Sequence, residues 1–248
     1  MGILVVVTAK RRHPGKRGME VLEHVARYRI SVVRAVERLP AFEQVDRPAV
    51  RKLLGNLERD GFLGKGNLVT GSANHPLGKY YFLTPRGSQW VGGRTRTGPV
   101  APPARLRAYA ILWFCCLAEV LRFKYTAEEL RKDWPALYSG GPAHYYIDTE
   151  GDADRLALLR VDGGKGGRWE VAVRRIQQDV ASRCSSSPFR KFVLSHRFGV
   201  TILTATERKA ERLLEEAEHR LATCGPIHVR TCAVPGLLDL ILDKPDPL

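Results

Sequence analysis

The sequence predicts an α+β protein: a helical N-terminal half that ends in a β-hairpin, followed by a C-terminal half built on a mixed α/β sheet. Three observations predict this fold class. A bounded amphipathic helix over residues 46–61 is followed by two short strand patterns. A segment rich in Pro, Gly and Arg, residues 94–105, has no periodicity and indicates a linker. After residue 143, strand and helix patterns alternate, which is typical of a mixed sheet flanked by helices.

The helix predicted over residues 46–61, DRPAVRKLLGNLERDG, organises the N-terminal half. Asp46 is a suitable N-cap, and Pro48 fits the first turn because the N–H that it lacks would have no partner there. Gly61 lies where a helix would end. Four apolar residues recur at helical spacing and form one stripe: Val50, Leu53, Leu54 and Leu57.

The opposite face of this helix is basic and includes Gly55. A glycine inside a helix costs roughly 1 kcal/mol relative to alanine. Its position on the outer face therefore predicts that something bulky approaches the helix from that side.

The other N-terminal elements follow from caps and turn residues. We predict a helix over residues 18–29 and a shorter one over 31–39 capped by Ser31, with a turn at 40–45. Strands are predicted at 62–63 and 79–83, joined by a loop rich in Gly, Asn and Ser. The basic segment KRRHPGKR, residues 10–17, is expected to be an extended or flexible arm that lies on phosphates, enters a minor groove, or is simply solvated.

The C-terminal half begins with an apolar helix over residues 106–123, expected to pack between the two halves. Thr126 and Glu129 form a capping box for the next helix. Strands at 144–148 and 156–162 predict a hairpin, followed by a helix at 168–182 and a buried strand at 199–205. Thr206 caps a helix to residue 221, a strand follows at 227–231, and 237–242 is a last apolar segment.

The charge of the chain is concentrated in its first 100 residues. The formal net charge is +14, and residues 1–100 hold 18 basic against 7 acidic residues. Such a surface is typical of proteins that displace counterions from nucleic acid. No apolar run is long enough to span a bilayer. The five cysteines, without metal-site spacing, indicate reduced, buried thiols in a cytoplasmic protein.

The order "L..L...GFL...YYFLT.RG" resembles the winged helix-turn-helix superfamily. The resemblance implies that the helix before the hairpin enters a DNA major groove and that the hairpin contacts the DNA backbone. It assigns DNA contacts to these residues of the helix and the hairpin: Arg47, Arg51, Lys52, Asn56, Arg59, Lys65, Asn67, His75 and Lys79. The basic arm adds four candidate DNA contacts by its charge alone: Arg11, Arg12, Lys16 and Arg17. Two alternatives stay open: a small core with a solvated charged face, and a winged-helix module that binds protein.

Catalytic chemistry has one candidate in the second half. Asp148 and Asp162 each end a predicted strand, and if they converge at a sheet edge they can hold Mg²⁺ against a scissile phosphate, with Lys165 or Lys191 nearby to neutralise developing charge. This pattern resembles the restriction-endonuclease-like fold. Active members of that fold carry an acid followed two residues later by Lys, whereas Arg160 stands where the metal-binding acid belongs. A degenerate copy without a cofactor is therefore the expectation, and a Mg²⁺-dependent nuclease or nickase the alternative.

Taken whole, the winged-helix pattern, a linker, and then "HYYID........LALLRVDGG" and "FGVTILTAT.ER" resemble the replication-relaxation family of bacterial plasmid and mobile-element proteins. The resemblance implies a DNA-binding accessory or regulatory factor in plasmid replication, transfer (conjugation) or transcription. Its domains would be a winged helix with a basic arm (1–93), a linker (94–105), and a connector with an α/β, nuclease-like domain (106–248). Expected partners are duplex DNA, a second copy of the chain, and replication or transfer proteins, with no membrane.

Overall fold

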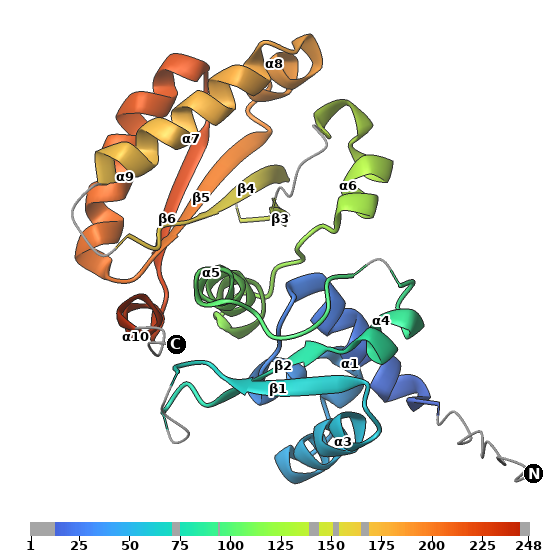
Figure 1. The fold of residues 1–248 in the computed structure, drawn as a ribbon. Coiled ribbons are helices and arrows are strands. Elements are labelled where there is room, and N and C mark those ends of the chain that lie inside the picture. The colour runs from blue at the N-terminus through green and yellow to red at the C-terminus, as the bar shows by residue number, and fades with distance from the viewer. Residues whose placement is uncertain are drawn as a thin grey trace, which may run out of the picture.

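A computed structural model describes residues 13–70, 75–93, 95–138, 144–150, 154–164 and 169–243. The fold is α+β, as predicted, with a two-stranded sheet in the N-terminal half and a four-stranded sheet in the C-terminal half (Figure 1). Within the described residues, no helix is both long and apolar enough to cross a bilayer.

The N-terminal half consists of short helices followed by a hairpin and one more helix. Its elements are α1 (Gly15–Tyr28), α2 (Val33–Val36), the 3-10 turn η1 (Pro40–Phe42), α3 (Arg47–Arg59), β1 (Leu63–Asn67), β2 (Lys79–Leu83) and α4 (Pro85–Trp90). The strands β1 and β2 pair antiparallel, with Leu63 opposite Leu83.

The local signals around α3 are confirmed. The Asp46 side chain accepts a hydrogen bond from the Ala49 N–H at 3.1 Å, and Pro48 lies in the first turn. Of the predicted apolar stripe, Val50, Leu54 and Leu57 are buried, whereas Leu53 is half-buried. The stripe packs against α1, whose inner face is Val21, Leu22 and Val25 as expected.

Two predictions on helix starts are wrong. Ser31 caps no helix, because its N–H donates to the Tyr81 carbonyl at 3.0 Å and its carbonyl accepts from the Tyr81 N–H at 2.8 Å. This bridge gives β2 a second neighbour, and α2 begins only at Val33. The basic arm also ends earlier than predicted, since α1 begins at Gly15 and includes Lys16 and Arg17.

The segment predicted as a linker ends in a buried helix. Helix α5 (Pro102–Leu112) starts inside it, with proline at a first-turn position, and Arg105 is buried. A π-helical turn, η2 (Trp113–Leu117), continues α5. The predicted helix over 106–123 therefore ends at Leu117. Further on, Thr126 and Glu129 form the expected capping box of α6 (Ala127–Asp133), which is followed by the 3-10 turn η3 (Pro135–Leu137).

The C-terminal sheet has the strand order β3-β4-β5-β6. Strand β3 (Tyr145–Asp148) is antiparallel to β4 (Arg155–Val161), while β5 (Phe198–Thr204) and β6 (His228–Ala233) continue the sheet in parallel. The connecting elements are α7 (Trp169–Cys184), α8 (Ser187–Leu194), α9 (Glu207–Leu221) and the 3-10 turn η4 (Ala222–Cys224), and α10 (Leu237–Leu242) follows β6. Thr206 caps α9 through the Lys209 N–H, as predicted.

The two faces of this sheet have different partners. Alternate residues such as Leu156 and Leu158 pack with α7, α8 and α9, whereas Ala157 and Leu159 pack with α5, η2 and α10. Figure 1 shows α7 and α9 on the outer face and α5 between the sheet and the N-terminal half. The core that contains α5 also includes Tyr28 and Ile30, so one continuous core joins both halves, as expected for the apolar connector.

Candidate nucleic-acid interface

The outer face of α3 carries a row of basic and polar side chains. Arg47, Arg51, Gly55 and Arg59 follow one another at four-residue spacing, which places them on one side of the helix. Lys52 and Asn56 lie next to this row. We call the following residues the α3 cationic stripe: Arg47, Arg51, Lys52, Asn56 and Arg59.

The side chains of the stripe differ in whether they have an ion-pair or hydrogen-bond partner. Arg47 is paired with Glu37 of the α2 C-terminus, with Nε 2.7 Å from Oε1 and Nη2 3.1 Å from Oε2. The Arg59 guanidinium donates to Asn56 Oδ1 at 2.8 Å. Arg51 and Lys52 are exposed, and in the described part of the chain neither has an acidic partner. These two cations are therefore available to an anionic ligand.

Gly55 lies in the middle of the stripe, where space is open. A Cβ built on it would meet no other residue within 4 Å. The packing of the protein thus gives no reason for glycine at this position. The predicted reason, close approach of a bulky partner, stays a prediction.

The hairpin contributes two exposed lysines and two half-buried residues. Lys79 is exposed, and Lys65, also exposed, lies 2.7 Å from Glu58 Oε1. The Asn67 carbonyl accepts from Arg105, and half-buried His75 lies 3.7 Å from Asp239. Of the four predicted hairpin contacts, only the two lysines are on the exposed surface.

The closed end of the hairpin is fixed to the C-terminal half. Asp243, whose side chain is 4 % exposed, accepts from the Thr70 N–H at 2.9 Å and from Arg105 Nη2 at 2.7 Å. Leu77 packs so closely on Gly236 that a Cβ there would collide with the Leu77 side chain. The same glycine has a φ of +74°, which other residues rarely adopt. The hairpin is therefore anchored beside α10 (Figure 1).

Because the hairpin is anchored in this way, a cavity of about 950 Å³ forms beside the first half of α3. We call it the α3 groove. Its lining comes from α2, α3, β2, α5, η2 and the turn before α10. Basic residues on its rim are Arg34, Arg38, Arg47, Arg51 and Lys79, and aromatic residues below them are Tyr81, Tyr109 and Trp113.

The basic arm is only partly within the described residues. Lys16 and Arg17 are exposed in the first turn of α1, and the Arg17 guanidinium lies 6.0 Å from the Phe42 ring centroid. Arg11 and Arg12 lie outside the described residues, so their predicted contacts stay predictions.

The predicted convergence of Asp148 and Asp162 is wrong. Asp148 is opposite Arg155 at the start of β4, whereas Asp162 follows the last residue of β4. At about 3.3 Å per residue, the length of β4 separates the two by roughly 20 Å. Two consecutive antiparallel strands run in opposite directions, so their C-terminal ends lie at opposite ends of the strand pair. The two carboxylates therefore cannot share a metal ion.

Each of these carboxylates has a basic partner of its own. Asp148 is 1 % exposed and lies 3.4 Å from Arg230 Nη2. Asp162 is paired with Lys209, and its Oδ1 accepts from the Gly164 N–H at 3.2 Å. Lys165 lies outside the described residues. No group of three metal-ligating side chains occurs among the residues that the structure describes.

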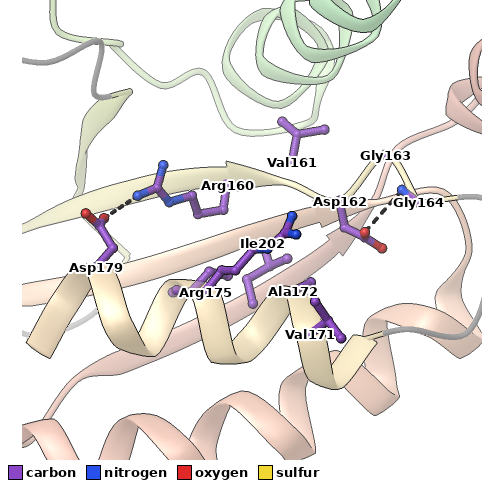
Figure 2. A pocket seen from close by; sticks show the side chains of 11 residues that line it. Arg160, Val161, Asp162, Gly163, Gly164, Val171, Ala172, Arg175, Asp179 and Ile202 are labelled. Atoms are coloured by element: carbon purple, nitrogen blue, oxygen red, sulfur yellow. Dashed lines mark hydrogen bonds and ion pairs between the residues drawn. The ribbon is translucent and has the colours of Figure 1, made fainter.

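A cavity of about 570 Å³ lies beside Asp162, between β4 and α7 (Figure 2). Its walls include Val161, Val171 and Ile202. Figure 2 shows the ion pair between Arg160 and Asp179 at one end of this cavity and Asp162 at the other. Because these acids already have basic partners, the described residues of the cavity wall offer no set of free carboxylates for a metal ion.

Comparison with known proteins assigns neither a family nor a function to this chain. No family model matches the chain, and searches of curated proteins and of solved structures gave no significant match.

Proposed function

We propose that this protein binds nucleic acid through the α3 cationic stripe, with its N-terminal half acting as a winged helix. The observation that carries the proposal is the pair of exposed cations, Arg51 and Lys52, without acidic partners among the described residues. They project from a helix whose opposite face is fixed in the core by Val50, Leu54 and Leu57. Rigid elements of this kind position recognition side chains accurately.

The order of elements supports the winged-helix part of the proposal. Helices α1, α2 and α3 precede a hairpin, and the Ser31–Tyr81 bridge adds a short third segment to that hairpin. Helix α3 has 13 residues and is therefore about 20 Å long. An α-helix fits the major groove of B-DNA, which is about 12 Å wide. The anchored hairpin limits the expected backbone contacts of the wing to Lys65 and Lys79.

Electrostatics support the same face. Residues 1–100 carry a net charge of +11 out of +14 for the chain. Where binding depends on phosphate contacts, the logarithm of the binding constant falls linearly with the logarithm of the salt concentration. On duplex DNA the slope is about −0.9 for each phosphate neutralised. A salt-dependent interaction is therefore the expected signature.

The test is fluorescence anisotropy of labelled duplex DNA over a series of salt concentrations. Replacing both Arg51 and Lys52 by alanine should weaken binding and reduce the salt slope by about 2, because two phosphate contacts are lost. The matched control is the double variant Arg174→Ala and Arg208→Ala, which removes two exposed arginines from α7 and α9. This control should bind like the wild type.

Three outcomes would contradict the proposal. They are a salt-insensitive interaction, equal loss of affinity in both double variants, and a stable protein complex at this face without nucleic acid. The last outcome would instead support the winged helix as a protein-binding module.

The biological pathway stays a prediction. A role in plasmid replication or transfer follows only from the resemblance to the replication-relaxation family. The nuclease alternative has no structural observation in its favour, because Asp148 and Asp162 lie at opposite ends of β4 and each has a basic partner.

A further inference from the structure

The α3 groove differs in its chemistry from the α3 cationic stripe beside it. The stripe is an exposed helix face, whereas the groove is a cavity of about 950 Å³, at the upper end of the range for ligand sites, ~300–1,000 Å³. Its rim is basic and its lower wall is aromatic. These two properties together restrict what it can bind.

Three cations on the rim come from three different elements. Arg34 of α2, Arg51 of α3 and Lys79 of β2 are exposed, and in the described part of the chain none has an acidic partner. The other two rim arginines are held in place: Arg47 by Glu37, and Arg38 by the Ala118 carbonyl at 2.6 Å. Among the described residues that line the groove, Glu37 is the one acid, and it is already paired with Arg47. The groove therefore has a surplus of positive charge.

The aromatic wall is partly accessible. Trp113 and Tyr81 are half-buried, while Tyr109 is buried and donates its hydroxyl to the Pro235 carbonyl at 3.0 Å. The indole N–H of Trp113 has no hydrogen-bond acceptor among the residues that the structure describes. It is available to a ligand oxygen or ring nitrogen.

A cationic rim over aromatic rings is the chemistry that binds unpaired nucleotides. The cations follow the phosphates, and the rings stack on bases, which is possible only when the bases are not already stacked in a duplex. Leu77 and Gly236, which pack closely on each other, line the same groove as Trp113 and Arg51.

From this arrangement we propose that the α3 groove binds a single-stranded nucleic acid segment adjacent to the duplex, with an unpaired base stacked on Trp113. The inference rests on the proposed function, because the duplex part is bound by the α3 cationic stripe. It extends that function from duplex DNA to junctions between duplex and single strand.

The experiment compares three labelled probes by anisotropy: a blunt duplex, and the same duplex with a short oligothymidine extension on the 3′ or the 5′ end. Matching RNA extensions distinguish ribose from deoxyribose preference. One extended duplex should bind about fivefold or more tightly than the blunt duplex, which is the stacking contribution of a single base. A 2-aminopurine at the first unpaired position should lose fluorescence when it stacks.

Variants of Trp113 place the effect in the groove. Trp113→Leu should lose the advantage of the extension and the 2-aminopurine quenching while retaining blunt-duplex affinity, and Trp113→Phe should restore part of both. The matched control is Trp169→Leu, a half-buried tryptophan on α7. Should Trp113→Leu fail to fold, Arg34→Gln tests the same groove from an exposed position and should reduce only the advantage of the extension.

The outcomes separate the two proposals. Blunt-duplex binding with no gain from any extension would overturn the groove inference and leave the proposed function intact. A gain that survives both Trp113→Leu and Arg34→Gln would also overturn it, because the extension would then bind elsewhere. Binding of none of the probes would overturn both proposals. Capture of a protein segment in the groove in place of nucleic acid would overturn the groove inference alone.

Discussion

At the scale of single residues, the structure holds some titratable side chains in surroundings that change their protonation. His24 on α1 is 6 % exposed, and its Nε2 has no hydrogen-bond partner in the described part of the chain. Burial, together with the nearby charge of Arg27, lowers the pKa of His24 to about 4. For Glu129, burial raises the pKa, but hydrogen bonds from Arg27 and Thr126 outweigh that effect and the pKa is lowered to about 2.

The His24 environment predicts a loss of stability in mild acid. The unfolded chain binds a proton at this site near pH 6.5, while the folded protein does so only near pH 4. The contribution is therefore fully present above pH 6.5 and is lost as the pH falls from 6.5 to 4. We expect it to be on the order of 3 kcal/mol of the free energy of unfolding, measured by urea denaturation at a series of pH values.

Substitution identifies the histidine responsible. His24→Gln should flatten this part of the pH profile, whereas His219→Gln, at an exposed position of α9, should leave it unchanged. His144, whose pKa is lowered to about 3 by burial and by Lys124, adds a similar slope that both variants retain. An unaltered profile in His24→Gln would contradict the assignment.

At the scale of elements, α3 is defined by interactions between neighbouring residues, whereas the position of the hairpin depends on residues far along the chain. The cap by Asp46 and the apolar stripe define α3 from neighbouring residues alone. The pairing of β1 with β2 sets the register of the hairpin. The position of the hairpin against the C-terminal half depends on Asp243, which lies 173 residues beyond Thr70. The helix was therefore predictable and the docking of the hairpin was not.

Gly55→Ala tests whether the outer face of α3 is a contact surface. Alanine should raise the free energy of unfolding by up to ~1 kcal/mol, because it favours the helix and its Cβ meets nothing within 4 Å. If the nucleic-acid backbone lies against this position, the same substitution should weaken binding in the anisotropy measurement. Unchanged affinity would refute close approach at Gly55.

The matched glycine for this experiment is Gly18 on α1. A Cβ there would lie 3.1 Å from Pro14 Cβ and 3.3 Å from Leu57 Cδ2. Gly18→Ala should therefore gain less stability than Gly55→Ala, or lose some, without any effect on binding beyond that of partial unfolding.

At the scale of the whole molecule, the two halves share one core through α5 and η2. Leu112 and Phe114 are buried in it together with residues of both sheets. Two further sets of hydrogen bonds fix the halves to each other: from the Thr70 N–H and hydroxyl to Asp243 at 2.9 and 2.8 Å, and from the Arg27 guanidinium to Glu129, two bonds of 2.6 Å each. We therefore expect the halves to unfold together.

Leu112→Ala tests this coupling. Removing a fully buried leucine side chain typically costs about 2–5 kcal/mol. The variant should lower the urea midpoint equally when unfolding is followed by far-UV circular dichroism and by tryptophan fluorescence, since both halves lose the same core. Leu194→Ala, at a position 55 % exposed, is the control and should change little. Two separate transitions would show that the halves are independent.

The candidate site was predictable in part. The exposed positions of Arg51, Lys52, Arg59, Lys65 and Lys79 follow from helix and strand periodicity. His75 and Asn67 were also placed on the hairpin, but their contacts with Asp239 and Arg105 depend on how the hairpin docks. Arg34 and Trp113 were not identified as site residues, because the groove they line forms only when α2 and η2 come together.

The sequence by itself determined the elements whose signals lie within one helix or strand: the Asp46 and Thr206 caps, the Thr126–Glu129 capping box and the buried strand β5. Only the tertiary structure decided that Ser31 pairs with Tyr81, that Arg105 is buried against Asp243, and that Asp148 and Asp162 lie at opposite ends of β4. The physical reason is the separation along the chain of the residues that interact. Caps and periodicity involve residues a few positions apart, whereas strand direction, buried ion pairs and cavities depend on segments that meet only when the chain is folded.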